Sequence, residues 1–306
     1  MIEAPLLLLA ASLLIGVLLQ RVKAIPENAH LALNRYVIYV ALPALVLINV
    51  PRISLELDVI FPIATAWIVF LVAVPTVLFV GRRSGWSRPT MGSLILTAGL
   101  GNMAFLGYPV VEALYGAEGL EVAVMVDQPG NFLVTATLGI ILAGIFSAES
   151  QRKRDIVRSV LEFPPFIVFI GAMILNLTGT QFTGVTLEVL EQFAATLTPV
   201  ALISIGMQLK FTGITKQIRP LTFGLFYKMI AAPVLIFVLY TVVFGREGLM
   251  IQVSVMMAAM PPMITGAIIA ASYGLNTRLA ALMAGVGVPI AAVTLAIWYL
   301  ILGGYG

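Results

Sequence analysis

Long apolar runs separated by short polar connections dominate the pattern along this chain. Each run is near the ~20 residues that a helix needs to cross ~30 Å of hydrocarbon. The pattern predicts an all-α polytopic membrane protein with ten transmembrane helices, at approximately residues 2–19, 31–50, 57–80, 91–116, 121–146, 161–177, 187–209, 221–244, 249–274 and 279–302.

Composition supports this class and excludes several others. The chain has 306 residues, of which 60% are hydrophobic and 10% charged, and its mean hydropathy is +1.07. It contains no cysteine, which excludes disulfides, thiolate metal sites and cysteine nucleophiles. No P-loop, HExxH or GxSxG motif is present, so neither an ATP-driven pump nor a hydrolase is indicated. We expect no enzyme activity, no metal site, no organic cofactor and no nucleic-acid partner.

Two of the apolar runs contain residues that interrupt helices. The fourth run holds Gly101–Pro109, in which two glycines, an asparagine and a proline fall in mid-span. The ninth holds Met260–Gly266 with two adjacent prolines. In a helix interior Gly costs about 1 kcal/mol and Pro about 3 kcal/mol. Both spans are therefore predicted to stop, continue as extended chain and restart, and such backbone is tolerated in a membrane only where protein covers it or it lines a cavity.

If the two breaks cross, two helix N-termini point into one small volume. Each start carries about half a positive charge and free N–H groups, which favour an anion such as a carboxylate. The residues that we expect to bind this substrate are Gly101, Asn102, Gly107, Pro109, Asn131, Pro261, Pro262 and Thr265. The alternative is that both breaks are packing kinks, because Gly and Pro are common in membrane helices.

Two ionisable residues lie deep inside predicted spans. Asp127, followed by Gln128, is in the fifth span, and Lys228 is in the eighth. A buried charge is costly in hydrocarbon and normally faces a cavity or a partner. We expect Asp127 and Gln128 to take part in coupling, with Asp127 carrying a coupling H+. Lys228 could pair with Asp127, attract the anionic substrate, or snorkel along its own stem.

Paired features in the two halves of the chain indicate an internal repeat. Tyr115–Gly116 and Tyr273–Gly274 each end a broken run and are 158 residues apart, and Pro75 and Pro233 have the same separation. Because each half would contain five spans, an odd number, the second half must be inverted relative to the first. Inverted repeats with paired broken helices are typical of secondary transporters.

The positions of positive charges predict the orientation. Most of the 17 Lys and Arg residues fall in the connections after odd-numbered spans, whereas only Arg52 and Arg246 lie in the opposite connections. The positive-inside rule then places both termini outside the cell membrane. The residues on the predicted cytoplasmic side are Arg21, Lys23, Arg35, Arg82, Arg83, Arg88, Arg152, Lys153, Arg154, Arg158, Lys210, Lys216, Arg219 and Arg278.

The two interrupted segments resemble those of the auxin efflux carrier family. Asn102–Gly116 is similar to that family's N-x-x-x-x-G-I-P-L-L-x-A-M-Y-G stretch, and the segment from Ala258 through Ile264 to Tyr273 is similar to A-A-L-P-Q-G-I…Y. The short connection at Ser147–Arg158 resembles prokaryotic members, while Met103 and Gly266 differ from the plant pattern.

This resemblance implies a bile-acid-transporter-like fold with two moving parts. Residues 1–52 and 158–211 would form a scaffold that dimerises, residues 53–146 and 218–306 a transport domain, and residues 147–157 a short cytoplasmic linker. Members of the family export or exchange organic anions, including auxin and dicarboxylates such as malate.

The sequence therefore predicts a secondary carrier of a small organic anion that works by elevator-type alternating access and is linked to protons. One alternative is a sodium-coupled symporter, with Gln128, Asn131 and Thr265 as cation ligands. Another is a non-transporting membrane sensor.

Overall fold

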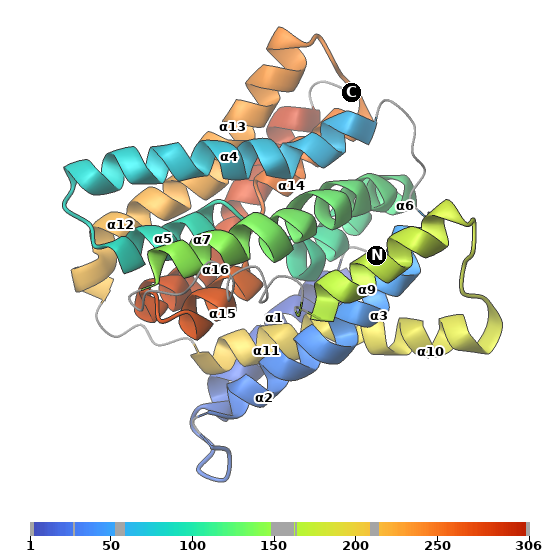
Figure 1. Ribbon diagram of the computed structural model, residues 1–306, viewed down its shortest axis with the longest axis horizontal. Coiled ribbons are helices and arrows are strands. Elements are labelled where there is room, and N and C mark those ends of the chain that lie inside the picture. The colour runs from blue at the N-terminus through green and yellow to red at the C-terminus, as the bar shows by residue number, and fades with distance from the viewer. Residues whose placement is uncertain are drawn as a thin grey trace.

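The computed structural model describes residues 3–26, 28–52, 59–147, 162, 164–208 and 214–303. Within these ranges every regular element is a helix, and the one extended pairing is an isolated antiparallel bridge between Gly101 and Pro262 (Figure 1). The prediction of an all-α fold is confirmed. The starts of the third and sixth predicted spans, the end of the seventh and most of the predicted linker lie outside the described residues.

Helices of the first half follow the apolar runs closely. Segments labelled η are π-helical turns, except η2, which is a 3-10 turn. The elements are α1 (Glu3–Leu19), α2 (Ala29–Tyr36), η1 (Val37–Ala41), α3 (Leu42–Asn49), η2 (Val50–Arg52), α4 (Ile60–Arg83), α5 (Arg88–Ala98), η4 (Met103–Gly107), α6 (Tyr108–Val126), η5 (Asp127–Phe132), η6 (Thr135–Gly139) and α7 (Ile140–Phe146). Gly116, with φ +70°, interrupts α6 where the fourth predicted span ends.

The second half has the same kind of continuous and interrupted helices. Its elements are α9 (Pro164–Leu177), α10 (Gly184–Ala195), α11 (Leu197–Gln208), α12 (Ile214–Phe226), η7 (Tyr227–Ala231), α13 (Ala232–Phe237), η8 (Val238–Val243), α14 (Leu249–Ala258), α15 (Ile264–Ser272) and α16 (Thr277–Gly303).

Six helical stretches in the described ranges are long and apolar enough to cross a membrane, and three shorter apolar helices accompany them. The protein is therefore a multi-span membrane protein, as predicted. The number of ten spans and the inverted repeat stay predictions.

The helices pack in two groups. In the lower part of Figure 1, α1 packs on α11, and α3 packs on both α9 and α10. In the upper part, α4 packs on α5, α6 and α14, while α16 packs on α5, α12 and α15. Contacts of α11 with α16 and η4, and of α1 with α6, join the two groups.

Two short helices form the centre of the second group. From Thr90 to Ala98 every residue of α5 is buried, and α14 is buried from Val253 to Ala258. A helix that is apolar all round is stable only where other helices surround it. Both of these central helices end at a break.

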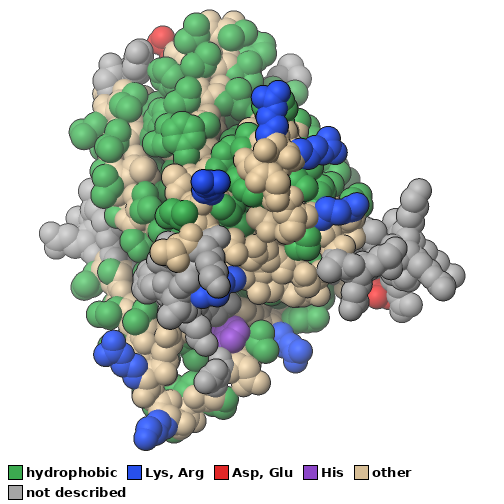
Figure 2. Space-filling model, turned by 90° about the vertical axis from the view of Figure 1, so that its left-hand side faces the viewer, with side chains coloured by type: hydrophobic (Ala, Val, Ile, Leu, Met, Phe, Trp, Pro, Cys, Tyr) green, Lys and Arg blue, Asp and Glu red, His purple; other side chains and the backbone are tan. Residues whose placement is uncertain are grey.

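One end of the molecule carries much of the positive charge. There the Arg88 guanidinium donates to the Ile145 carbonyl (2.8 Å), and Asn276 N–H donates to the Pro89 carbonyl (3.3 Å). Figure 2, which faces this end, shows many Lys and Arg side chains and few acidic ones. Arg246 lies at the other end of α4, with its guanidinium carbon 5.2 Å from the centre of the Phe61 ring. This distribution agrees with the predicted loop assignment, and the orientation in the membrane stays a prediction.

Candidate functional site at the crossing of two interrupted helices

The two predicted breaks are present, and they cross each other. One lies between α5 and η4, and the other between α14 and α15. Asn102 N–H donates to the Pro261 carbonyl (2.8 Å), and Met263 N–H donates to the Leu100 carbonyl (3.1 Å). These two bonds flank the Gly101–Pro262 bridge, so each extended segment satisfies backbone groups of the other.

Glycine permits the close approach of the chains around the crossing. A Cβ added to Gly101 would lie 3.1 Å from Lys228 Nζ, and one added to Gly107 would lie 2.9 Å from Met257 Sδ. Pro262 packs against Gly287, where an added Cβ would lie 2.6 Å from Pro262 Cδ. A larger side chain at Gly287 would meet the rigid ring of Pro262, whereas at Gly101 and Gly107 it would displace the ends of the Lys228 and Met257 side chains.

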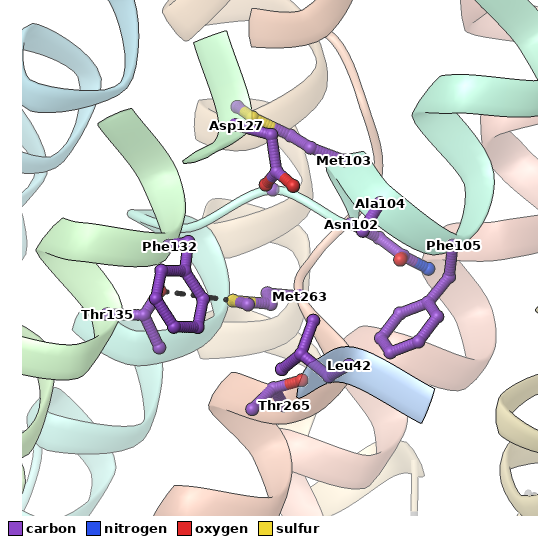
Figure 3. A pocket seen from close by; sticks show the side chains of 11 residues that line it. Leu42, Asn102, Met103, Ala104, Phe105, Asp127, Phe132, Thr135, Met263 and Thr265 are labelled. Atoms are coloured by element: carbon purple, nitrogen blue, oxygen red, sulfur yellow. Dashed lines mark hydrogen bonds between the residues drawn. The ribbon is translucent and has the colours of Figure 1, made fainter. Parts of the chain in front are cut away.

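A small buried cavity lies beside the crossing. Its volume is about 20 Å³. Because a water molecule needs roughly 10–15 Å³ by this measure, there is room for about one. Side chains from both restarted helices, from η5 and η6 and from α3 surround it (Figure 3). The lining residues are Leu42, Gly101, Asn102, Met103, Ala104, Phe105, Asp127, Phe132, Thr135, Met263 and Thr265.

The starts of two helices line this cavity. Met103, Ala104 and Phe105 are the first three residues of η4, and Thr265 is the second residue of α15. The first N–H groups of a helix have no partner within it and carry partial positive charge. The cavity therefore lies where two electropositive helix ends meet.

Asn102 is the most unusual side chain of the cavity. It is 1% exposed, yet neither its amide nitrogen nor its amide oxygen has a hydrogen-bond partner. A buried polar atom without a partner is costly, at about 1–3 kcal/mol. Such a group is kept where it serves something other than stability, for example as a ligand contact.

Asp127 is held at the cavity by three donors. Its carboxylate accepts from the Tyr108 hydroxyl (2.8 Å), from Gln128 Nε2 (3.1 Å) and from Asn131 Nδ2 (3.2 Å), and the side chain is 3% exposed. Figure 3 shows the carboxylate pointing toward the cavity. The carboxylate is therefore fixed in place by neutral donors of its own chain.

Asn131 connects this carboxylate to the crossing. Its Nδ2 also donates to the Gly101 carbonyl (3.0 Å), and its Oδ1 accepts from Gly101 N–H (3.1 Å). Asp127 and Asn131 are both in η5, a π-helical turn that contains Pro129. π-helical turns are common at functional sites because they re-aim side chains within a helix.

Lys228 is fully buried on the other side of Gly101. Its Nζ donates to the carbonyl of Ala258, the last residue of α14, at 2.6 Å. No ion pair joins Lys228 to Asp127, both of which the structure describes. The Lys228 side chain is not exposed, so it does not snorkel toward the surface. It also does not line the cavity, and the expected pairing with Asp127 is not found.

The predicted site residues fall into three positions. Gly101, Asn102, Asp127 and Thr265 line the cavity itself. Gln128 and Asn131 donate hydrogen bonds to the carboxylate of Asp127. The remaining predicted residues shape the backbone around it and do not line it, namely Gly107, Pro109, Pro261, Pro262 and Lys228.

Sequence reasoning missed the apolar lining and two hydroxyl groups, those of Tyr108 and Thr135. Tyr108 has the shortest hydrogen bond to Asp127, and Leu42 is the single lining residue from α3. Thr135 could have been found, because it follows Asn131 by four residues and so lies on the same helix face. Within the described ranges, no group of three or more His, Cys, Asp or Glu residues could hold a metal ion.

Comparison with known proteins defines the class. The family model described as "Membrane transport protein" matches residues 2–299, so this chain belongs to that family, the auxin efflux carriers that the two motifs resemble. It is a family of transporters and not of enzymes.

Relatives from archaea and bacteria are also named as transporters. The chain is 27% identical over 292 residues to an uncharacterized transporter of Methanothermobacter thermautotrophicus, covering 94% of each chain. It is 26% identical over 290 residues to an uncharacterized transporter of Methanocaldococcus jannaschii, covering 89% of each chain. It is 25% identical over 300 residues to the uncharacterized transporter YfdV of Escherichia coli, covering 94% of this chain and 93% of the relative.

Proposed function

We propose that this membrane transport protein is a secondary carrier of a small organic anion, a mono- or dicarboxylate, which it binds at the crossing. The observation that carries the proposal is the Asn102 amide, buried without a partner beside two helix starts. A carboxylate placed there would accept from the amide and from N–H groups in the first turns of η4 and α15, apart from that of Met103, which donates to the Gly101 carbonyl (2.9 Å). Hydrogen bonds to a charged group contribute about 1.5–3 kcal/mol each, so a few suffice for useful affinity.

Asp127 supports a link to protons. When its carboxylate is ionised, it places a negative charge on the wall of the cavity that would receive the anion. The Asp127 carboxylate and an anion inside the same small cavity would repel each other strongly, because little water screens them there. A proton on Asp127 removes this repulsion, so the anion and the proton bind together. Gln128 and Asn131 keep the carboxyl group positioned in either state.

The small size of the cavity supports a cycle in which the protein opens to bind substrate and closes again. The cavity has room for about one water molecule, and the side chains of Asn102, Asp127 and Thr265 are buried. Substrate therefore binds after the walls move apart. Leu42 comes from the first helix group and the other lining residues come from the second. An elevator-like displacement between a scaffold (residues 1–52 and 158–211) and a transport domain (residues 53–146 and 218–306) would open the cavity along this boundary.

The remaining parts of the proposal follow from the sequence. They are two inverted five-helix repeats, a homodimer formed through the scaffold, and a location in the cell membrane with both termini outside. The pairing of the two broken helices supports the repeat.

A thermal-shift screen with purified protein tests the substrate class. The wild type is mixed with a series of monocarboxylates and dicarboxylates at two pH values, because a ligand that binds the folded state raises its apparent melting temperature. We expect stabilisation by at least one carboxylate, and about tenfold or more weaker binding by Asn102→Ala, the equivalent of one lost charge-assisted hydrogen bond. Asn49→Ala is the matched control, because Asn49 lies on α3 and does not line the cavity. If no carboxylate stabilises the wild type, or if Asn102→Ala binds equally well, the proposal is wrong.

Proton linkage is tested separately with Asp127→Asn. Because this change removes the titrating group and keeps the shape of the side chain, we expect anion binding that no longer strengthens as pH falls. Uptake into proteoliposomes at several pH values measures the same effect. An unchanged pH response in the variant would remove the role of Asp127.

A further inference from the structure

Four helix ends meet at the crossing, and only two of them face the cavity. The starts of η4 and α15 line it, whereas the ends of α5 and α14 do not. The end of a helix has free carbonyl groups and partial negative charge. In transporters with broken helices, such ends and the unwound carbonyls next to them commonly coordinate a metal cation from solution.

At this crossing, donors of the protein bond four of the carbonyls at or beside these helix ends. Met263 N–H bonds the Leu100 carbonyl, Asn102 N–H bonds the Pro261 carbonyl, and Asn131 Nδ2 bonds the Gly101 carbonyl. The Ala258 carbonyl, at the last residue of α14, accepts from Lys228 Nζ (2.6 Å). Each of these carbonyl oxygens thus already uses one of its two lone pairs for a donor of the protein.

The position of Lys228 within the fold accounts for this contact. It lies in η7, a π-helical turn between α12 and α13, and is among the largest side chains with no exposure. Trp298 Nε1 and Tyr227 Oη fix the same segment by donating to the carbonyls of Met229 (3.0 Å) and Val69 (2.7 Å), respectively. Gly101 lies against both Lys228 and the cavity, since a Cβ there would lie 3.1 Å from Nζ.

We infer that the Lys228 ammonium is a tethered cation that takes the place of a coupling metal ion at the end of α14. It balances the negative helix end from within the chain, so the crossing needs no Na+ to hold its shape or to bind the anion. This inference deepens the proposed function by assigning the coupling of the same site. Of the ligands expected for a sodium ion, Asn131 Oδ1 already accepts from Gly101 N–H, whereas Gln128 Oε1 is buried without a partner. The inference therefore differs from the sodium-coupled alternative in the tethered ammonium at the end of α14 and is separated from it by the test below.

Removal of the ammonium tests the inference without any organic anion. Thermal unfolding is measured for the wild type and for Lys228→Met in chloride salts of Na+, K+, methylammonium and choline at equal ionic strength. Lys228→Met keeps an unbranched apolar stem and loses the charge. We expect the wild type to melt at one temperature in all four salts. The variant should melt lower in choline, and Na+ or methylammonium should raise its melting temperature further with each increase in concentration.

Two more variants make the test specific. Lys228→Arg keeps a cation and should be as indifferent to the salt as the wild type. Lys23→Met removes an exposed lysine from the connection after α1 and should leave the melting temperature unchanged in every salt. A cation effect shared by Lys23→Met would mark it as non-specific and overturn the assignment.

The outcomes separate this inference from the proposed function. If Na+ stabilises the wild type over choline, or binds to it in a calorimetric titration, the protein does hold a metal ion and the inference is wrong. If Lys228→Met is indifferent to all four cations, or fails to fold in each of them, no vacancy for a cation exists and the inference is again wrong. Neither result depends on whether a carboxylate binds at Asn102.

Discussion

The two breaks differ in what holds them in shape. Polar side chains of η5 hold the first, where Asn131 bonds both backbone groups of Gly101 and also Asp127. The second contains two prolines, and it is held by close packing and by the bond from Lys228 to the Ala258 carbonyl. A Cβ on Gly266 would collide with the Leu96 carbonyl, and Pro262 is packed against Gly287.

This difference assigns the two breaks different tasks. Polar contacts at the first break can change with protonation or with an incoming ligand, because Asp127 and the unpartnered Asn102 belong to it. Contacts at the second break depend more on shape, with one buried polar contact, from Lys228 Nζ to the Ala258 carbonyl, at the end of α14. Under the proposed function, the first break would therefore respond to the proton or the anion, and the second would mainly support it by packing.

The largest effect on stability is expected from Asn131→Ala, which removes the hydrogen bonds of Asn131 to Gly101 and to Asp127 at the first break. It leaves Gly101 N–H without its partner and removes one of the three donors to Asp127. We expect a loss of on the order of 2–4 kcal/mol in the free energy of unfolding, since each buried unsatisfied group costs about 1–3 kcal/mol. Denaturant unfolding in detergent measures it. Asn49→Ala serves as control, and an equal loss in both variants would show that the network is not special.

A smaller loss is expected at the second break from Gly266→Ala. The added methyl group meets the Leu96 carbonyl, a backbone atom that cannot rotate away. Overpacking of this kind costs about 1–3 kcal/mol. Gly171→Ala in α9 is the matched control, because a Cβ there would meet no atom within 4 Å. If both alanine variants unfold alike, the close packing at Gly266 does not support the break.

The smallest effect is expected from Tyr108→Phe. It removes the 2.8 Å bond to Asp127 but leaves the donors from Gln128 and Asn131 in place. A single hydrogen bond contributes about 0.5–1.5 kcal/mol, more when one partner is charged. Tyr39→Phe, at a side chain that is 61% exposed, controls for loss of a hydroxyl. A loss as large as that of Asn131→Ala would place Tyr108, and not Asn131, at the centre of the network.

Local chemistry explains how much of this site could be predicted from the sequence. Gly101, Asn102, Pro261 and Pro262 stand out in apolar runs because each disfavours a helix interior, so both breaks could be placed. Asp127 stands out for a different reason, because a charged side chain inside a membrane span is costly and usually functional.

The rest depends on tertiary contacts that leave no local mark. Leu42 is one leucine among many, and only the packing of α3 against the crossing brings it to the cavity. Lys228 could be identified as buried, but its partner is a backbone carbonyl, Ala258, which has no signature in a sequence. Three roles were therefore open for Lys228 until the fold was known.

The narrow space beside Asn102 bears on how blockers of this protein should be sought. A compound shaped to fill the closed form could be little larger than a water molecule. If the protein carries a carboxylate as proposed, a bulkier acid that enters the opened form and keeps the walls from closing would bind well and halt transport. Size, more than charge, is then expected to separate substrate from inhibitor, so enlarged versions of the proposed carboxylate substrate are the inhibitors to test first.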